Sequence, residues 1–420
     1  MMDTPGCKIA KAMASVGDRI SSLPDELLHH IMSFLPARDA VQTCVLSPRW
    51  RHLWATALCL NIDAKDFTRE RKFINFVTTL LLRRGCMPLE SFRLQAAGPA
   101  IFLTRFQNIA NLWISHALWC KVQTLSIINY KDSNGPVTFQ AYRYPFTSSY
   151  LKRLHLCYVH IASPFLNKIM CNCSALEDLE MINCVIVGTE FSSATLKNLS
   201  IDYKDFPDLE TCEDEDYHDI VINMPSLVSL RIGSLLRAKP ILVEVQSLLT
   251  ASISVDHTQS VTFAYACDTL SALSNVKNVE LLALYDVEGE RSLQSDMQLC
   301  QTVFTNLTTL SLSSWCLHDN CKVLLYMLKR SPNLEILTLK LKNWFPWDDG
   351  GMKPLCEETT EPFHCKKLKK IEIIYPRHNK RVGMLVTILS ANIITPLEIN
   401  IKPLLGYSMY EDPGQSYDGN

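Results

Sequence analysis

Residues 151–156 read Leu-Lys-Arg-Leu-His-Leu (LKRLHL), with leucines at the first, fourth and sixth positions. In an extended strand Leu154 and Leu156 point to the same side, whereas a helix would place them about 200° apart. The stretch therefore predicts a short β-strand with one apolar face. A single strand of this length cannot bury that face by itself, so its partners have to come from elsewhere in the chain.

The same spacing recurs ten more times along the chain. The copies are LESFRL at 89, VQTLSI at 122, LEDLEM at 176, LKNLSI at 196, LVSLRI at 227, a degenerate LLTASI at 248, VKNVEL at 276, LTTLSL at 307, LEILTL at 334 and LKKIEI at 368. Successive copies begin 20 to 34 residues apart, mostly within the period of leucine-rich repeats. Stacking the strands in parallel would give them one continuous core.

The series resembles an irregular leucine-rich-repeat array of the plant type. This resemblance implies an α/β solenoid over residues 59–362, with parallel strands on its concave face and short helices or loops on its convex side. The alternative is an ordinary α/β sheet, whose strands show similar patterns. That alternative requires chain reversals and longer, more variable connections, and it does not explain a series of near-identical motifs.

A second pattern lies upstream, in LPDELLHHIMSFLP at residues 23–36. Its apolar residues are three and four positions apart and so share one face of a helix, which Pro36 should end. A second helix is expected over residues 38–46, and a third through Trp54, with Ser47 as its N-cap and Pro48 at its first position. Three helices in about 40 residues seldom fold alone, so the unit either docks on the chain or presents a face to another protein.

Residues 18–54, DRISSLPDELLHHIMSFLPARDAVQTCVLSPRWRHLW, closely resemble an F-box of the kind common in plants. We assign the F-box to residues 18–58. The resemblance implies binding to a Skp-family adaptor, and through it to a cullin–RING ubiquitin ligase. It also makes Trp50 a core residue and implies an adaptor-binding set of Leu23, Pro24, Leu27, Leu28, Ile31 and Leu35. Leu23 and Pro24 would insert at the adaptor interface, and the other four would be divided between the interface and the internal core.

Three terminal segments complete the expected organisation. Residues 363–405 have the order strand, loop, helix and strand, which resembles the FBD region that often closes plant F-box proteins. Such a region would also cap the last repeat, as a solenoid requires. Residues 1–17 and 406–420 are expected to be flexible ends.

The variable strand positions of the repeats should face the concave surface, where a target protein would bind. These side chains change sign from repeat to repeat, which suits a protein ligand better than a polyanion. Three aromatic residues at positions 344, 345 and 347 need either a burial partner or a ligand. The target-binding candidates are Arg153, His155, Asp178, Glu180, Arg231, Lys340, Trp344 and Trp347.

Composition argues against several other classes of function. The 420 residues carry a net charge of -2, and the lysines around 366–370 lack interleaved aromatics, so nucleic acid is not an expected partner. No apolar run reaches the roughly 18 residues of a membrane span, and the first residues lack the apolar core of a signal peptide. A membrane partner and secretion are therefore not expected.

The 16 cysteines are scattered and would be reduced, small hydrophobic residues in an intracellular protein. Zinc would be the alternative for Cys171, Cys173 and Cys184, or for Cys316, His318 and Cys321, but neither group has two clean ligand pairs. No phosphate-binding, nucleophile-elbow or metalloprotease motif occurs. We expect no metal, cofactor or catalytic residue.

Together these patterns predict a non-catalytic substrate receptor of a Skp–cullin–F-box ubiquitin ligase, located in the nucleus, the cytoplasm or both. Two alternatives stay open. The array could hold a small molecule that completes the target site, or the chain could be a repeat scaffold with no role in ubiquitin transfer. Neither the target nor a pathway can be identified from these residues.

Overall fold

Every copy of the repeated motif forms a β-strand that begins at the third residue of the motif in the computed structural model. LKRLHL at 151 gives β5 (Arg153–Cys157), and the degenerate copy at 248 gives β14 (Thr250–Val255). The prediction of repeated strands is confirmed. The structure describes residues 20, 22–96, 103–129, 137–138, 146–187, 190–202, 218–233, 238–255, 263–283, 301–313, 318–341, 365–375, 381–393 and 398–403.

The chain divides into two units, and the first contains residues 1–224 and 236–239. Its main sheet has the strand order β1-β2-β3-β5-β7-β10, and every neighbouring pair is parallel. The strands that join β5 in this sheet are β1 (Cys59–Asp63), β2 (Ser91–Gln95), β3 (Thr124–Ile128), β7 (Asp178–Ile182) and β10 (Asn198–Asp202).

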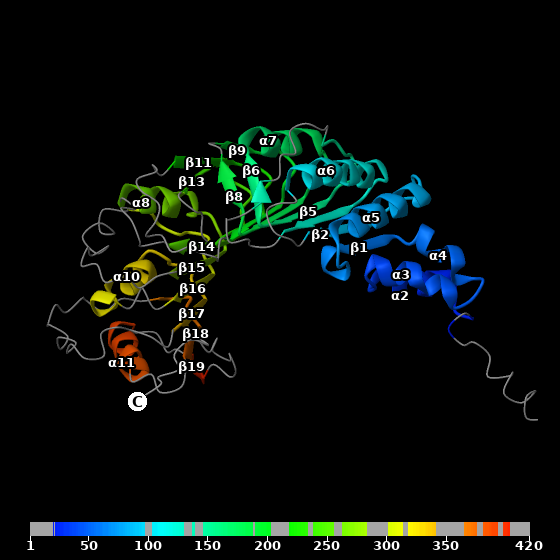
Figure 1. Ribbon diagram of the computed structural model, residues 1–420. Coiled ribbons are helices and arrows are strands. Elements are labelled where there is room, and N and C mark those ends of the chain that lie inside the picture. The colour runs from blue at the N-terminus through cyan, green and yellow to red at the C-terminus, as the bar shows by residue number, and fades with distance from the viewer. Residues whose placement is uncertain are drawn as a thin grey trace, which may run out of the picture. The chain divides into compact units, whose positions relative to one another are not determined.

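Helices of the first unit lie on one face of this sheet (Figure 1). They are α5 (Glu70–Arg84), α6 (Leu103–Trp119) and α7 (Ser163–Asn172), with a short 3₁₀ turn, η2 (Ala64–Asp66), before α5. Short parallel pairs form where the chain leaves the main strands. They involve β4 (Val137–Thr138), β6 (Val159–Ala162), β8 (Val185–Val187), β9 (Glu190–Ser192) and β11 (His218–Asn223).

The second unit contains residues 225–235 and 240–420. Its strand order is β12-β14-β15-β16-β17-β18-β19, again parallel throughout. The strands beside β14 are β12 (Ser229–Ile232), β15 (Asn278–Ala283), β16 (Thr309–Ser313), β17 (Ile336–Lys340), β18 (Lys370–Tyr375) and β19 (Glu398–Pro403). The helices are α8 (Phe263–Ala272), α10 (His318–Lys329) and α11 (Arg381–Asn392), and β13 (Ala238–Val243) crosses the boundary between the units.

The apolar motif positions form in-register columns beneath each sheet. In the first unit Leu154 pairs with Leu125 and Leu179, and Leu179 pairs with Leu199. All four are essentially inaccessible to solvent, as are the corresponding residues of the second unit, Leu230, Leu310 and Leu337. Parallel in-register pairing explains why the leucine recurs. A column of side chains is fully buried only if every strand supplies an apolar side chain to it.

The order expected between Phe363 and Ile401 is present as β18, α11 and β19. The N-terminal helices are α2 (Asp25–Ser33), α3 (Ala37–Gln42) followed by the 3₁₀ turn η1 (Thr43–Val45), and α4 (Trp50–Thr56). The expected start of the third helix at Ser47 and Pro48 is wrong. The amides of Trp50 and Arg51 bond the carbonyls of Ser47 and Pro48 in a tight turn, and the α-helix begins only after it.

Candidate functional site

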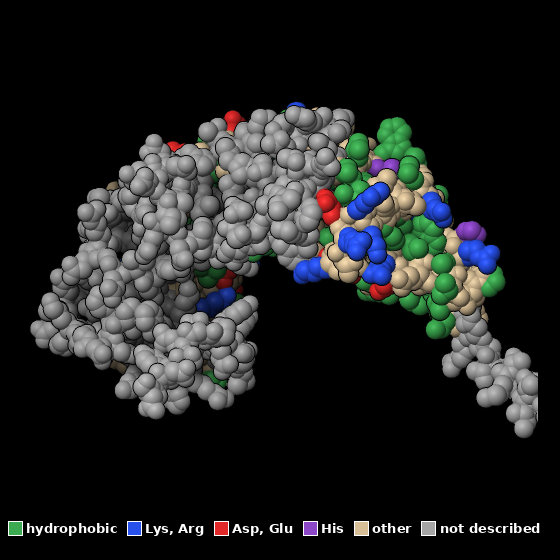
Figure 2. Space-filling model, in the orientation of Figure 1, with side chains coloured by type: hydrophobic (Ala, Val, Ile, Leu, Met, Phe, Trp, Pro, Cys, Tyr) green, Lys and Arg blue, Asp and Glu red, His purple; other side chains and the backbone are tan. Residues whose placement is uncertain are grey.

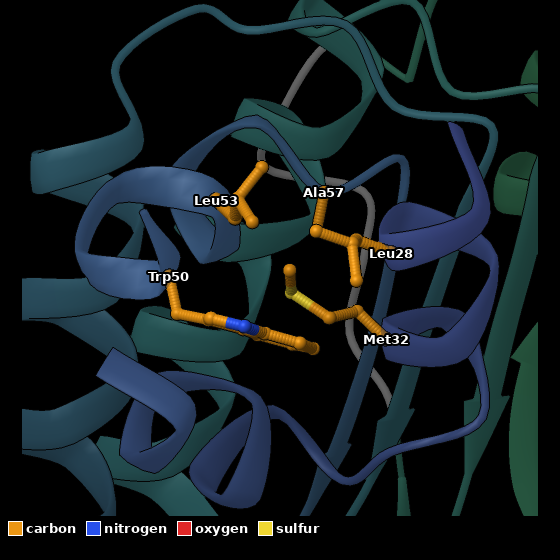
Figure 3. Packing of buried hydrophobic residues seen from close by; sticks show 5 residues of the cluster. All are labelled: Leu28, Met32, Trp50, Leu53 and Ala57. Atoms are coloured by element: carbon orange, nitrogen blue, oxygen red, sulfur yellow. The ribbon is translucent and has the colours of Figure 1, made fainter. Parts of the chain in front are cut away.

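Two of the three N-terminal helices, α2 and α4, are held together by a small apolar core (Figure 3). Leu28 and Met32 of α2 pack against Trp50 and Leu53 of α4 and against Ala57, which follows that helix. Leu28 and Met32 are four residues apart and therefore lie on the same side of α2. The buried position of Trp50 agrees with the role expected for it as a core residue.

Large apolar side chains on the stripe of α2 next to this core remain in solvent. Leu27 is 48% exposed, and Ile31 and Pro24 are also exposed. Phe34, at the C-terminal end of the helix, is 73% exposed and lies seven residues after Leu27, on the same helical face. Figure 2 shows hydrophobic side chains at the surface of the part of the first unit that carries these helices. Such a patch is typical of a protein-binding surface.

The structure separates the six adaptor-binding candidates into exposed, fully buried and partly buried residues. Leu27, Ile31 and Pro24 face solvent, but Leu28 is 0% exposed and belongs to the core described above. Leu28 is therefore removed from the adaptor-contacting part of the set and belongs to its internal-core part, because a fully enclosed side chain cannot contact a partner while the unit stays folded. Leu23 is partly buried against the same core, and Leu35 is also partly buried.

Two exposed apolar residues outside the predicted set lie at the end of η1. Val45 is 82% exposed, and Leu46 is exposed as well. Val45 lies four residues after Val41 and fits the helical spacing of residues 38–46, so its position in the sequence predicts burial and carries no signal of exposure. Phe34 was also absent from the predicted set, although it shares the spacing of Leu27 and Ile31.

The three-helix unit is fastened to the first strand of the sheet. The side-chain amide of Asn61, on β1, donates to the carbonyl oxygen of Ser33 at 2.8 Å and to that of Leu35 at 3.4 Å. Pro36 forms a parallel bridge with the same residue. These bonds hold the turn between α2 and α3 against β1, so the exposed face of α2 has a fixed orientation relative to the strands of the first unit.

A buried arginine makes a second connection at this junction. The guanidinium Nη1 of Arg84, at the end of α5, donates to the carbonyl oxygen of Trp54 at 3.1 Å. Burial lowers the pKa of Arg84 to about 10, and its Nη2 has no hydrogen-bond partner among the residues that the structure describes. A buried donor without a partner costs free energy. The hydrogen bond from Arg84 to Trp54 on α4 offsets part of that cost.

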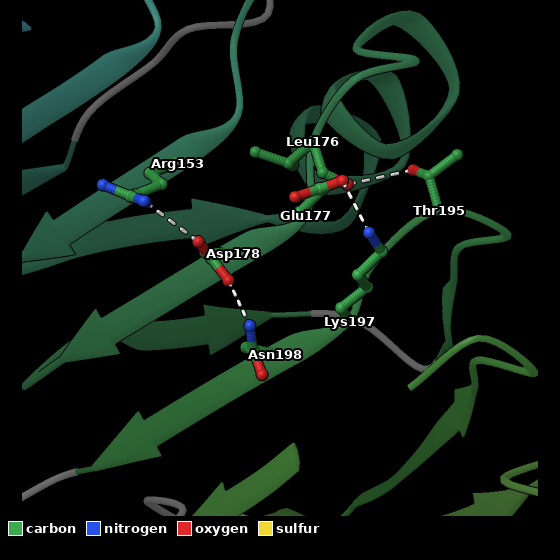
Figure 4. Close-up of polar contacts among 7 residues, drawn as sticks. All are labelled: Arg153, Leu176, Glu177, Asp178, Thr195, Lys197 and Asn198. Carbon is green, nitrogen blue, oxygen red and sulfur yellow. Dashed lines mark hydrogen bonds and ion pairs between the residues drawn. The ribbon is translucent and has the colours of Figure 1, made fainter. Parts of the chain in front are cut away.

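On the face of the first sheet opposite the leucine columns, polar side chains pair across neighbouring strands (Figure 4). We call this face, and the corresponding face of the sheet in the second unit, the open face. Asp178 accepts a hydrogen bond from Arg153 Nε at 3.1 Å on one side and from the Asn198 amide on the other. Just before the strands, Lys197 forms an ion pair with Glu177 at 2.7 Å. The exposed pairs add little stability but create a surface of alternating charge.

His155 and Glu180 form the next row of the open face, and their side chains approach to 3.7 Å. Burial lowers the pKa of His155, the positive charge of Arg93 lowers it further, and Glu180 acts in the opposite direction. The imidazole is therefore mainly neutral at pH 7, when it can both donate and accept one hydrogen bond. Arg153, His155, Asp178 and Glu180 thus lie side by side, as their strand positions predicted.

In the second unit, Arg231 is exposed on β12 and Lys340 lies on β17. Lys340 Nζ forms an ion pair with Glu280 Oε1 at 2.6 Å, across the intervening strand β16. The remaining two target-binding candidates, Trp344 and Trp347, lie outside the described residues.

The cysteines singled out for zinc occupy different surroundings. Cys173 and Cys184 are buried, and burial raises the pKa of their thiols to about 11 and about 12, whereas Cys171 is exposed. Cys321 is buried, and Cys316 lies outside the described residues. Over the described part of the chain no group of three or more His, Cys, Asp or Glu side chains is arranged to hold a metal ion, and no helix there is long and apolar enough to cross a membrane.

Comparison with known families identifies two domains in the chain. Residues 20–59 match the model of the F-box domain. Residues 137–395, more than half of the chain, match the model of the leucine-rich-repeat domain of At1g61320/AtMIF1.

Similar proteins come from Arabidopsis thaliana. F-box/LRR-repeat protein At4g14096 is 27% identical over 415 residues, covering 89% of this chain and 82% of the relative. F-box/FBD/LRR-repeat protein At5g22660 is 26% identical over 412 residues, covering 86% of this chain and 84% of the relative. With an N-terminal F-box followed by parallel leucine-rich-repeat strands, the chain belongs to the F-box/leucine-rich-repeat family.

Proposed function

We propose that this protein is the substrate-recognition subunit of a Skp–cullin–F-box ubiquitin ligase. The observation that carries the proposal is the exposed apolar face of α2, where Leu27, Ile31 and Phe34 remain in solvent although the adjacent stripe of the helix is already packed into a core. An F-box generally binds a Skp-type adaptor, and this face supplies the large apolar anchors that such an interface needs.

In this proposal the adaptor contacts Pro24, Leu27, Ile31 and Phe34, with Leu23 and Leu35 at the edge of the contact. Val45 and Leu46 are further candidates, because both are exposed on the neighbouring turn. The repeat array binds a protein target through the open face. Ubiquitin transfer itself belongs to partner subunits in the nucleus or cytoplasm, and this chain contributes proximity by raising the effective concentration of target lysines.

The experiment that tests the proposal measures binding of the purified full-length chain to a Skp-family adaptor. Changing Leu27 and Phe34 to Asp should weaken the complex by about 2–4 kcal/mol per anchor, the range of interface hot spots. The control is Leu82→Asp, which places one aspartate on an exposed leucine of α5 outside the three-helix unit and matches each single change. We expect the control to bind the adaptor as the unchanged protein does.

Two outcomes would contradict the proposal in different ways. If the unchanged protein does not bind any Skp-family adaptor, the ligase role is wrong and a scaffold role without ubiquitin transfer is favoured. If the double variant stays folded and binds normally, the adaptor contacts a different face of the three-helix unit.

A further inference from the structure

The last strand of the second unit, β19, has a neighbouring strand on one side only among the described residues. Figure 1 shows it at the end of the row of parallel strands, next to β18. At the other end of the strand order, β1 is bridged by Pro36 of the three-helix unit. An open strand edge is a template for pairing with another chain, and natural proteins usually cover or block it.

The apolar columns of the second unit end unfinished at this edge. Ile371 and Ile373 of β18 are fully enclosed, and in register beside them lie Ile399 and Ile401 of β19. Ile399 is partly exposed and Ile401 is 46% exposed, although both occupy core positions of the motif. The last repeat of a solenoid needs a polar outer side or a cover. One more strand with apolar side chains on this face would complete both columns.

The main-chain groups of β19 alternate between β18 and the free edge. The amide of Glu398 donates to the carbonyl oxygen of Lys369, just before β18, at 3.3 Å. The N–H and C=O of one residue point to the same side of a strand, and those of the next residue point to the other side. Ile399 and Ile401 therefore each direct an N–H and a C=O toward the free edge. An incoming strand has to satisfy these groups.

We propose that β19 pairs in antiparallel with β19 of a second copy of this chain, around a two-fold axis between the two Asn400 residues. In this register Ile399 lies opposite Ile401 of the second copy, and Ile401 lies opposite its Ile399. Each of these pairs exchanges two hydrogen bonds, which satisfies every main-chain group that the two isoleucines direct outward. The apolar columns of both copies continue into each other. The interface is isologous and closes at two copies.

Charge complementarity favours a second copy as the occupant of this edge. The register places Glu398 opposite Lys402 of the second copy, and the two-fold symmetry repeats the pair. Opposite charges that face each other across two strands are stabilising. Glu398 is exposed, and its carboxylate accepts a hydrogen bond from the Asn400 amide at 2.9 Å. Lys402 is 57% exposed and pairs with Glu372 at 3.0 Å, and its ammonium has three N–H groups, which is enough for both carboxylates.

Lys402 and Pro403 are residue types that block edge pairing in other proteins, but on β19 they select one register. A slide of two residues in either direction separates Lys402 from Glu398. One of these slides also sets Pro403, which has no N–H, opposite Ile399. A slide of one residue brings the isoleucines against the polar face. An extended segment of another protein would need matching charges of its own, whereas a second copy carries them already.

The first test is sedimentation velocity of the purified full-length chain without adaptor, at concentrations from about 1 to 100 µM. We expect the mass to rise from one chain to two across this range. Glu398→Lys and Lys402→Glu should each weaken self-association about ten-fold, because each sets like charges opposite each other twice. A mixture of the two variants should associate as the unchanged chain does, because every facing pair then has opposite charges again.

Lys369→Glu is the matched control for these variants. It reverses the charge of another lysine of the second unit, which pairs with Glu335 at 2.9 Å and lies before β18, one strand in from the free edge. Self-association of this variant should stay within about two-fold of the unchanged chain. Recovery in the mixture also shows that the single variants are folded, because unfolded chains would not regain association by mixing.

Residue-resolved hydrogen exchange gives a second readout, on the unchanged chain. The amides of Ile399 and Ile401 should exchange slowly at high concentration and at least about ten-fold faster after dilution. The amides of Asn400 and Lys402 point toward β18 and should exchange at the same rate in both conditions.

A chain that stays monomeric over the whole range would overturn the proposal. Slow exchange of the Ile399 and Ile401 amides in that monomer would assign the edge to another segment of the same chain, and fast exchange would leave it to a different protein. A dimer that persists in both single variants, or that mixing does not restore, would place the contact elsewhere and overturn the β19 pairing. The measurements use no adaptor, so their result is independent of the proposed ligase role.

Discussion

Leu27 and Leu28 are adjacent, identical residues in opposite environments. Leu28 is enclosed by Met32, Trp50 and Leu53, while Leu27 projects into solvent on the adjacent stripe of α2, about 100° around the helix. The helical spacing of the sequence places both on one broad apolar face, because a 100° step between neighbours is small enough to keep them together. Only the position of α4 decides which of the two is covered.

This difference predicts effects of very different size for the same substitution. Leu28→Ala should lower the free energy of unfolding of the three-helix unit by about 2–5 kcal/mol, because it removes packed methyl groups and leaves a cavity. Leu27→Ala should change it by no more than about 0.5 kcal/mol, as expected for an exposed site. Hydrogen exchange of the α2 and α4 amides measures both, and equal effects would contradict the assignment of Leu28 to the core and Leu27 to the surface.

At the scale of elements, the strands were predictable and some boundaries were not. The motif located eleven strands because each must contribute to a shared apolar column, but it did not identify β1. There the first apolar position is Ala57, which already serves the core of the three-helix unit. The start of α4 was misplaced because a tight turn through Ser47 and Pro48 satisfies the amides of Trp50 and Arg51 before the helix begins.

The junction between the three-helix unit and β1 gives a prediction at the same scale. Asn61→Ala should leave the carbonyl groups of Ser33 and Leu35 without this donor, at a cost of about 1–3 kcal/mol if water cannot replace it. Limited proteolysis between residues 20 and 58 should therefore become faster, while the repeat strands stay resistant.

Asn198→Ala is the matched control for this prediction. Asn198 is also on a strand of the first unit, but its side-chain amide donates to Asp178 on the open face. Its replacement should leave cleavage of the three-helix unit unchanged. Unaltered proteolysis in Asn61→Ala would mean that the apolar contacts and Arg84 hold the junction without the asparagine.

At the scale of the whole molecule, the proposed adaptor face and the open face lie on different elements and should be separable by mutation. Changing Arg153, Glu180 and Arg231 together to Ala should reduce the set of proteins that co-purify with the tagged chain when the proteasome is blocked. Adaptor binding should stay within about two-fold of the unchanged protein, because the three-helix unit and its core are untouched. Quantitative mass spectrometry of the purified complexes measures both.

The matched control removes Glu177, Lys197 and Lys369, which gives the same change in net charge. These residues form ion pairs just before or beside the strands and lie outside the predicted target-binding set. If the control loses the same partners, net charge and not the open face governs binding. Changing Trp344 and Trp347 together stays a separate prediction, in which lost target capture supports a binding loop and a lowered melting temperature supports a core role.

The sequence by itself determined the repeat architecture, the three N-terminal helices and the buried leucine columns. These depend on local spacing, because a strand or helix has a fixed side-chain period whatever surrounds it. The tertiary structure decided which apolar residues stay exposed, how Asn61 and Arg84 fasten the helices to β1, and which charges meet. Glu280 and Lys340 are 60 residues apart, and only in-register strands bring them to 2.6 Å across β16. Such contacts follow from strand order and register, which the period of a single repeat does not encode.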